Sequence, residues 1–197
     1  MNDYKLSGTL TVPGDKSISH RAAILSSIAT GKSYINDYSN ALDCKSTISC
    51  LEKMGIKMSY HDNTLNIVGT GLRSLKAASG PLECNDSGTT MRLLSGILSS
   101  QYFESDLDGN ELLRRRPMDR IILPLEKMGA KITSAHGDGH APLHIIGKYL
   151  KGIEYVPPIA SAQVKSAILL AGLYAEGETI VREPVPTRNH TEIMLKN

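Results

Sequence analysis

The segment Leu51-Glu52-Lys53-Met54-Gly55 recurs at positions 125–129 as Leu125-Glu126-Lys127-Met128-Gly129. In each copy an isoleucine stands three residues before the leucine, Ile48 in the first and Ile122 in the second. Apolar residues at this spacing predict an amphipathic helix, and a glycine directly after the pattern predicts its C-terminal end. The chain therefore contains two copies of a helix that ends in the same way.

The regions around this helix repeat as well. A strand-like run follows each copy, at residues 65–69 and 143–147. Asp62-Asn63 and Asp138-Gly139 precede these runs and predict hairpin turns. Upstream of each copy lies a run of small and apolar residues that predicts another helix. Each of these helices is apolar almost all round, so it is expected to be buried. We interpret each copy as strand, helix, strand, helix, strand, strand.

A third copy starts near Ser166. Residues 167–175 repeat the small apolar helix, and residues 176–181 resemble residues 30–35 in kind. We place the three copies at 13–80, 81–153 and 154–197. The chain ends inside the second helix of the third copy, which we interpret as truncation. The alternative is that the third copy simply differs from the other two.

Composition limits the class of protein. The 197 residues are 41% hydrophobic and 21% charged, ordinary values for a globular chain. No apolar run approaches the roughly 18–20 residues of a membrane span, and the N-terminus lacks a secretory signal. Three cysteines without a CxxC pair (Cys44, Cys50 and Cys84) indicate reduced thiols in the cytoplasm. A net charge of +2 argues weakly against binding of bulk nucleic acid.

Small polar and basic residues stand where each buried helix begins. Lys16 and Ser17 precede the first, residues 86–90 the second, and residues 161–163 the third. Free backbone N–H groups at a helix start favour an anion, and Arg21 adds a guanidinium fork one turn later. The spacing is not that of a Walker A loop. Each segment alone could be a capped helix start with solvated charges, but three copies that converge would form one anion-binding cleft.

Two further polar segments follow the second strands. Residues 114–120 contain the run Arg114-Arg115-Arg116, and residues 187–192 follow the third helix. The arginine run could be a solvated loop or a nucleic-acid patch, although no aromatic residues are interleaved for base stacking. His136, His140 and His144 are four residues apart, but intervening glycines and a proline break any helix, so no metal site is expected.

Five motifs occur in one order: Pro13-Gly14-Asp15-Lys16-Ser17, Ser87-Gly88-Thr89-Thr90-Met91-Arg92, Arg116-Pro117-Met118, Ser161-Ala162-Gln163 and Arg188-Asn189-His190-Thr191-Glu192. Together they resemble the 5-enolpyruvylshikimate-3-phosphate (EPSP) synthase family. The resemblance runs over essentially the whole chain but only a little under half of the family's usual length.

The resemblance implies an α/β (α+β) fold of the enolpyruvyl transferase type. Repeated βαβαββ units are arranged with pseudo-threefold symmetry around buried helices, in two similar domains. Residues 13–197 would form the N-terminal substrate-binding domain, and residues 1–12 a strand of the other domain. The implied reaction transfers the enolpyruvyl group of phosphoenolpyruvate to shikimate 3-phosphate in the shikimate pathway of aromatic amino acid biosynthesis. No metal or organic cofactor, nucleic acid or membrane is implied, and the remaining partner is the C-terminal domain.

The resemblance also implies binding residues. Lys16 should touch both substrates, while Gly88, Thr89 and Arg116 should surround phosphoenolpyruvate. The implied contacts to shikimate 3-phosphate are Ser17, Arg21, Ser161, Ala162, Gln163, Thr187 and His190. Catalytic acid and base residues are expected in the missing half, so the chain alone should be inactive. Gly88 leaves room for the inhibitor glyphosate in the complete enzyme.

Three departures from the family pattern stand out. Asp86 replaces a common asparagine, and a carboxylate beside an incoming anion is unfavourable unless it is paired. Ala162 replaces a serine often seen there, so a backbone N–H must supply one phosphate contact. Thr187 replaces a common serine.

Two alternatives stay open at this point. One is a non-catalytic anion- or RNA-binding module on the same repeat, which would bind polyanions with steep salt dependence. The other is the sister family, UDP-N-acetylglucosamine enolpyruvyl transferase. That family typically needs a reactive cysteine in a loop, and none of the three cysteines stands in such a loop.

Overall fold

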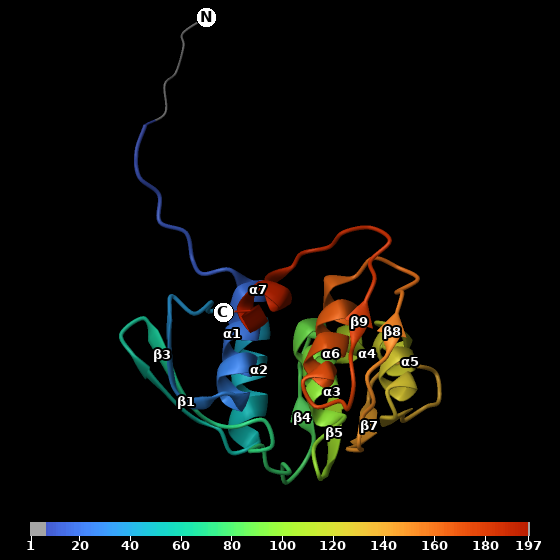
Figure 1. The fold of residues 1–197 in the computed structure, drawn as a ribbon. Helices are drawn as coiled ribbons and strands as arrows, with labels where there is room; N and C mark the ends of the chain where they lie inside the picture. The colour runs from blue at the N-terminus through green and yellow to red at the C-terminus, as the bar shows by residue number, and fades with distance from the viewer. Residues whose placement is uncertain (1–6, 197) are drawn as a thin grey trace, which may run out of the picture.

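The repeats of the sequence are visible as repeats of structure (Figure 1). The computed structural model describes residues 7–196. The first repeat contains α1 (Lys16–Ile28), β1 (Thr30–Asn36), α2 (Leu42–Lys53), β2 (Lys57–His61) and β3 (Thr64–Thr70). The second contains β4 (Leu82–Glu83), α3 (Gly88–Leu98), β5 (Glu104–Asp108), α4 (Glu111–Arg114), α5 (Asp119–Lys127), β6 (Lys131–Ser134) and β7 (Leu143–Ile146). The third contains β8 (Glu154–Tyr155), α6 (Ala162–Gly172), β9 (Ile180–Val181) and α7 (His190–Lys196).

Each repeat has its own sheet. The first sheet has the strand order β1-β3-β2 and is antiparallel. The second has the order β4-β5-β7-β6, in which β4 and β5 are parallel and the other neighbours antiparallel. In the third, β8 pairs with β9 in parallel. A parallel pair followed by an antiparallel hairpin matches the expected order of strands in the complete second repeat.

The repeated LEKMG segment closes both amphipathic helices with the same motif. The N–H of Ile56 donates to the carbonyl of Leu51 (3.1 Å), and the N–H of Ala130 donates to that of Leu125 (3.0 Å). The intervening glycines, Gly55 and Gly129, have φ angles of +87° and +102°. These bonds form a Schellman motif, which needs a left-handed residue after the helix. The predicted helix ends at α2 and α5 are therefore confirmed.

The predicted buried helices form the centre of the fold. All residues of α3 except Thr89 are buried, and α6 packs against α3 along its length. A Cβ atom at Gly96 would lie 2.3 Å from the carbonyl oxygen of Ala167, so the two backbones meet directly at this glycine. α1 contacts α3 more lightly and buries its other side against α2 and β3. This arrangement brings the starts of α1, α3 and α6 into one neighbourhood.

Two details differ from the sequence predictions. The Asp62-Asn63 turn joins β2 and β3 as expected, but the hairpin at Asp138-Gly139 has a longer loop, residues 135–142. This loop folds back on the start of α5, where the N–H of Met118 donates to the carbonyl of Gly139 (2.7 Å). The longer loop thus makes a contact with a neighbouring helix that the local sequence does not reveal.

The predicted strand near the N-terminus falls partly outside the described residues. Leu6 and the residues before it are not described, and residues 7–15 belong to no helix or strand. Leu10 and Val12 are 85% and 70% exposed on a segment that runs away from the body of the fold (Figure 1). Assignment of residues 1–12 to a second domain therefore stays a prediction.

Candidate functional site

The start of α1 presents two of the predicted ligands, Lys16 and Ser17. Asp15 caps the helix by accepting a hydrogen bond from the N–H of Ile18 (2.8 Å). The Nζ atom of Lys16 pairs with Oδ2 of Asp43 at 2.8 Å. The hydroxyl of Ser17 accepts a hydrogen bond from the guanidinium of Arg188 (3.2 Å). The first turn of α1 is thus joined to α2 and to the segment before α7.

Arg21 is buried, and it connects three helices. Its Nε donates to Thr191 Oγ1 in α7 (2.6 Å), and its Nη2 donates to Ser166 Oγ in α6 (2.6 Å). Nη1 donates to the carbonyl of Ser17 (2.9 Å). Burial, and then the charge of Arg188, lowers the pKa of Arg21. The structure therefore gives Arg21 a tertiary role in addition to the ligand contact that the resemblance implies.

The start of α3 carries a concentration of positive charge. Ser87 caps this helix by accepting a hydrogen bond from the N–H of Thr90 (3.1 Å). A Cβ atom at Gly88 would lie 2.9 Å from Nη1 of Arg92 and 3.5 Å from Nη1 of Arg116. Glycine therefore lets two guanidinium groups approach the first turn of the helix. Since the backbone N–H groups of this turn also favour an anion, both sources of positive potential coincide.

Sequence reasoning assigned no role to Arg92, although the residue lies inside a quoted motif. Its Nη1 donates to Oε1 of Gln163 (2.6 Å), and Nε2 of Gln163 donates to Oγ1 of Thr89 (2.7 Å). Burial, followed by the charges of Arg120 and Arg116, lowers the pKa of Arg92 to about 10. The available signal was positional, because Arg92 stands four residues after Gly88 as Arg21 stands four after Ser17.

The start of α6 forms the wall of an open cavity. Ser161 caps the helix by accepting from the N–H of Val164 (3.4 Å). Ser161, Ala162, Gln163 and Thr187 line the cavity together with Ala160 and Arg188, and its volume is about 410 Å³. Thr187 donates its hydroxyl hydrogen to Glu183. His190 is the first residue of α7, close to the same segment.

A second cavity, of about 540 Å³, joins the first two repeats. It is lined by Asp43, the partner of Lys16, and by Asp86, the partner of Arg116. Thr90 in α3 also donates to the carbonyl of Asp43 (3.3 Å). Lys16 and Arg116 are therefore connected through the start of α3 rather than placed on separate faces.

Gln163 connects the smaller cavity to the start of α3, because it lines that cavity and bonds to Thr89 in the first turn of the helix. The predicted ligands thus form two adjoining groups. One lies around Gly88 and the other around the start of α6.

A buried chain of polar groups lies beneath these helix starts. His20 Nδ1 bonds to Thr47 Oγ1 (2.6 Å), and Thr47 bonds to Thr90 (2.7 Å). The hydroxyl oxygen of Thr90 also lies 2.7 Å from Ser87 Oγ, within hydrogen-bond distance. Burial is the main cause that lowers the pKa of His20 to about 4. At neutral pH an uncharged imidazole therefore connects the starts of α1, α2 and α3.

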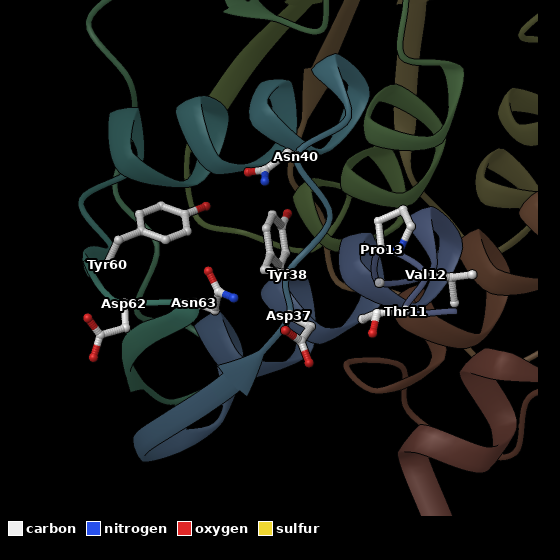
Figure 2. Close-up of a pocket in the computed structure, with 10 residues that line it drawn as sticks. Thr11, Val12, Pro13, Asp37, Tyr38, Asn40, Tyr60, Asp62 and Asn63 are labelled. Carbon is white, nitrogen blue, oxygen red and sulfur yellow. The ribbon is translucent and has the colours of Figure 1, made fainter. Parts of the chain in front are cut away.

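Figure 2 shows a different cavity, of about 360 Å³, between residues 11–14 and the first sheet. Tyr38, Asn40, Tyr60 and Asp62 are among the residues whose side chains surround it. None of the ten lining residues is lysine or arginine, and none is a predicted ligand. This cavity therefore does not suit a phosphorylated substrate.

The described residues give no sign of a metal centre. Across residues 7–196, no group of three or more His, Cys, Asp or Glu side chains is placed to hold a metal ion. His144 pairs with Asp106 instead, at 2.8 Å. In the same part of the chain, every helix is too short or too polar to cross a membrane.

Comparison with known proteins gives a consistent result. Residues 2–197 match the sequence profile of EPSP synthase (3-phosphoshikimate 1-carboxyvinyltransferase). The chain is 52% identical over 193 residues to a 3-phosphoshikimate 1-carboxyvinyltransferase of Acidithiobacillus ferrooxidans, covering 98% of this chain and 44% of that protein. It is 53% identical over 192 residues to one of Alkaliphilus metalliredigens, covering 98% and 45%.

Solved structures agree. An EPSP synthase of Acinetobacter baumannii superposes with a TM-score of 0.93 at 48% identity, covering 96% of this chain and 43% of that one. The chain thus spans a little under half the length of the relatives it matches.

Proposed function

The chain belongs to the EPSP synthase family, and on that premise we propose that it supplies the N-terminal substrate-binding residues of an enolpyruvyl transferase. The reaction moves the enolpyruvyl group of phosphoenolpyruvate to the 5-hydroxyl of shikimate 3-phosphate and releases phosphate. The observation that supports this most is the bridge from Arg92 through Gln163 to Thr89. It joins the starts of α3 and α6, where the two anionic substrates would lie side by side.

Phosphoenolpyruvate would bind at the start of α3. Thr89 offers a backbone N–H group at the positive end of the helix, and the N–H of Gly88, which here donates to the carbonyl of Asp86 (3.1 Å), lies beside it. Arg116 can grip a phosphate with two parallel hydrogen bonds, and Lys16 adds a point charge. Arg92 bonds to the amide oxygen of Gln163 and to the carbonyl of Pro117, so its charge also contributes to the positive potential of this region. Such a region stabilises a dianionic ligand.

Shikimate 3-phosphate would bind at the start of α6. Ser161 and Gln163 offer polar side chains there, and Ala162 contributes only its backbone N–H. Thr187 and His190 would close the site from the segment that leads into α7. Ser17 and Arg21 would reach it from α1, since Arg21 already contacts Ser166 in α6.

The chemistry requires charge stabilisation and proton transfer. Protonation of the methylene carbon of phosphoenolpyruvate creates an oxocarbenium-like centre, which the 5-hydroxyl oxygen attacks. The hydroxyl proton is removed, which gives a tetrahedral intermediate. Its C–O bond to phosphate then breaks and the methyl group formed in the first step loses a proton, which restores the C=C bond of the transferred enolpyruvyl group. Arg116 and Lys16 would hold the leaving phosphate in place. We expect the acid and base groups that move these protons to lie in the C-terminal domain. That domain corresponds to the part of the relatives that this chain does not cover.

Binding should depend on Arg116 and not on its neighbour in the arginine run. Loss of a charge-assisted hydrogen bond costs about 1.5–3 kcal/mol, so Arg116→Ala should weaken binding of phosphoenolpyruvate in the presence of shikimate 3-phosphate by roughly 10- to 100-fold. Arg115→Ala is the matched control, because Arg115 is exposed and makes only a 3.7 Å pair with Glu111. NMR titration of the backbone amides of Gly88 and Thr89 measures both variants. Equal losses in the two variants would remove the support for this site.

The chain alone should bind the substrates but not catalyse the reaction. With both substrates present, we expect phosphate release to be slower than that of a complete family member by at least about 10²- to 10⁴-fold, the typical contribution of proton transfer, because its groups are expected elsewhere. A colorimetric phosphate assay checks this, with a complete family member as the positive control. Release at a rate close to that of the control would show that the chain contains its own acid and base.

A further inference from the structure

We propose that Asp86 is an internal counter-ion that sets how tightly the site binds a phosphate group. The inference rests on the proposed function and names a residue that tunes it. Oδ1 of Asp86 pairs with Nη2 of Arg116 at 2.7 Å, and both side chains are about two-fifths exposed. An incoming phosphate must therefore compete for Arg116 with a carboxylate that already holds it.

The backbone keeps Asp86 in this position. The N–H of Ser87 donates to the carbonyl of Cys84 (2.8 Å), and the N–H of Asn110 donates to that of Asn85 (2.9 Å). Asn85 has a φ angle of +51°, a conformation that asparagine tolerates better than most residues. The turn that carries Asp86 is thus tied on both sides, so the carboxylate stays next to Arg116.

The Asp86 carboxylate also lies in the region of positive potential at the start of α3, where a phosphate ligand would bind. Asp86 lies just before Ser87, the residue that caps α3. A negative charge there is stabilised by the helix dipole, as the charge of a phosphate would be. Two like charges at one helix start repel, so Asp86 both neutralises Arg116 and opposes the ligand.

Lys16 shows the same arrangement on the other side of the cavity. Its pair with Asp43 measures 2.8 Å, and Asp43 and Asp86 line the same 540 Å³ cavity. Both cations expected to grip substrate are therefore held by carboxylates of the protein. Such pairs keep long side chains in place before a ligand arrives, and they reduce affinity in exchange.

The test is the variant Asp86→Asn, with inorganic phosphate as the probe. Asparagine retains an oxygen that can accept from Arg116 but removes the charge. The exposed ion pair and the repulsion between Asp86 and phosphate are both weak interactions, so removing the charge should lower the Kd about three- to tenfold. NMR titration of the full chain at fixed pH and ionic strength measures it. Asp62→Asn, on a 91% exposed side chain outside this cavity, controls for net charge.

A double-mutant cycle identifies the mechanism. In an Arg116→Ala background, Asp86→Asn should increase the affinity for phosphate much less, because the guanidinium for which Asp86 and phosphate compete is gone. A gain of the same size in that background, equal affinities of Asp86→Asn and the parent chain, or no detectable binding to either would overturn the proposal.

Failure of the proposed function can be distinguished from failure of the counter-ion role. If Asp86→Asn binds inorganic phosphate more tightly but the chain binds neither substrate, the counter-ion role is supported and the proposed function is contradicted. If the chain binds the substrates but Asp86→Asn does not bind phosphate more tightly, the function is supported and the counter-ion role is contradicted.

Discussion

Replacing Lys165 with methionine should lower the free energy of unfolding by about 3–5 kcal/mol. The Lys165 side chain is only 5% exposed, and its ammonium group contacts two carboxylates, Glu183 and Glu192, at 2.6 Å each. Methionine leaves both acids without their cation, and a partly buried uncompensated charge is costly. The methylene stem that Lys165 buries is largely retained, so the loss reports charge rather than volume. Urea unfolding followed by circular dichroism measures the change.

The controls separate charge from packing. Lys131→Met, on an exposed position of β6, should change stability by less than about 0.5 kcal/mol. Adding Glu183→Gln and Glu192→Gln to Lys165→Met should restore much of the lost stability, since neutral groups leave no uncompensated charge. A triple variant as unstable as Lys165→Met would show that the loss has another cause.

The same ion cluster positions the segment before α7. Burial alone would raise the pKa of Glu183, but hydrogen bonds from Lys165 and Thr187 outweigh it and lower that pKa. Burial likewise opposes the charge of Lys165, whereas its bonds to both carboxylates raise its pKa. Each partner therefore favours the charged form of the other. Thr187 is held by Glu183, so the cluster also fixes one of the residues proposed to bind shikimate 3-phosphate.

The chain should lose about 3 kcal/mol of stability as the pH falls from about 6.5 to about 4, through His20 alone. Burial lowers the pKa of His20 to about 4 in the folded chain, against an ordinary value of 6.5. Between these values the unfolded chain takes up a proton that the folded chain excludes. The contribution is therefore complete above pH 6.5 and is lost progressively toward pH 4. Glu183, with its lowered pKa, adds to the loss once the pH falls below its ordinary pKa of 4.5.

The variant His20→Asn isolates this effect. Asparagine can still bond to Thr47, but it does not titrate, so the pH dependence of unfolding between 6.5 and 4.5 should become flatter than in the parent chain. Urea midpoints at four or five pH values measure the slope. His61→Asn, on an 85% exposed histidine, should leave the slope unchanged. An unaltered slope in His20→Asn would contradict an uncharged buried imidazole.

Local patterns carried much of the fold. Gly55 and Gly129 predicted the helix ends correctly, because a Schellman motif involves only residues that are close together in the sequence. The buried helices α3 and α6 were evident from their composition, since a helix that is apolar all round has no face for water. The repeat then turned several weak signals at helix starts into one expectation of an anion site.

The arrangement of charges was decided only by the tertiary structure. The pairs Arg116–Asp86 and Arg92–Gln163 join residues 30 and 71 positions apart, and Arg21–Thr191 joins residues 170 apart. No periodicity encodes such contacts, because they depend on how the repeats pack. The sequence by itself determined the helices, their ends and the residue types at their starts. Which cation each carboxylate neutralises, and which arginine is buried, follows from how distant segments pack against one another, as α3 and α6 do at Gly96, where the absence of a side chain lets their backbones meet.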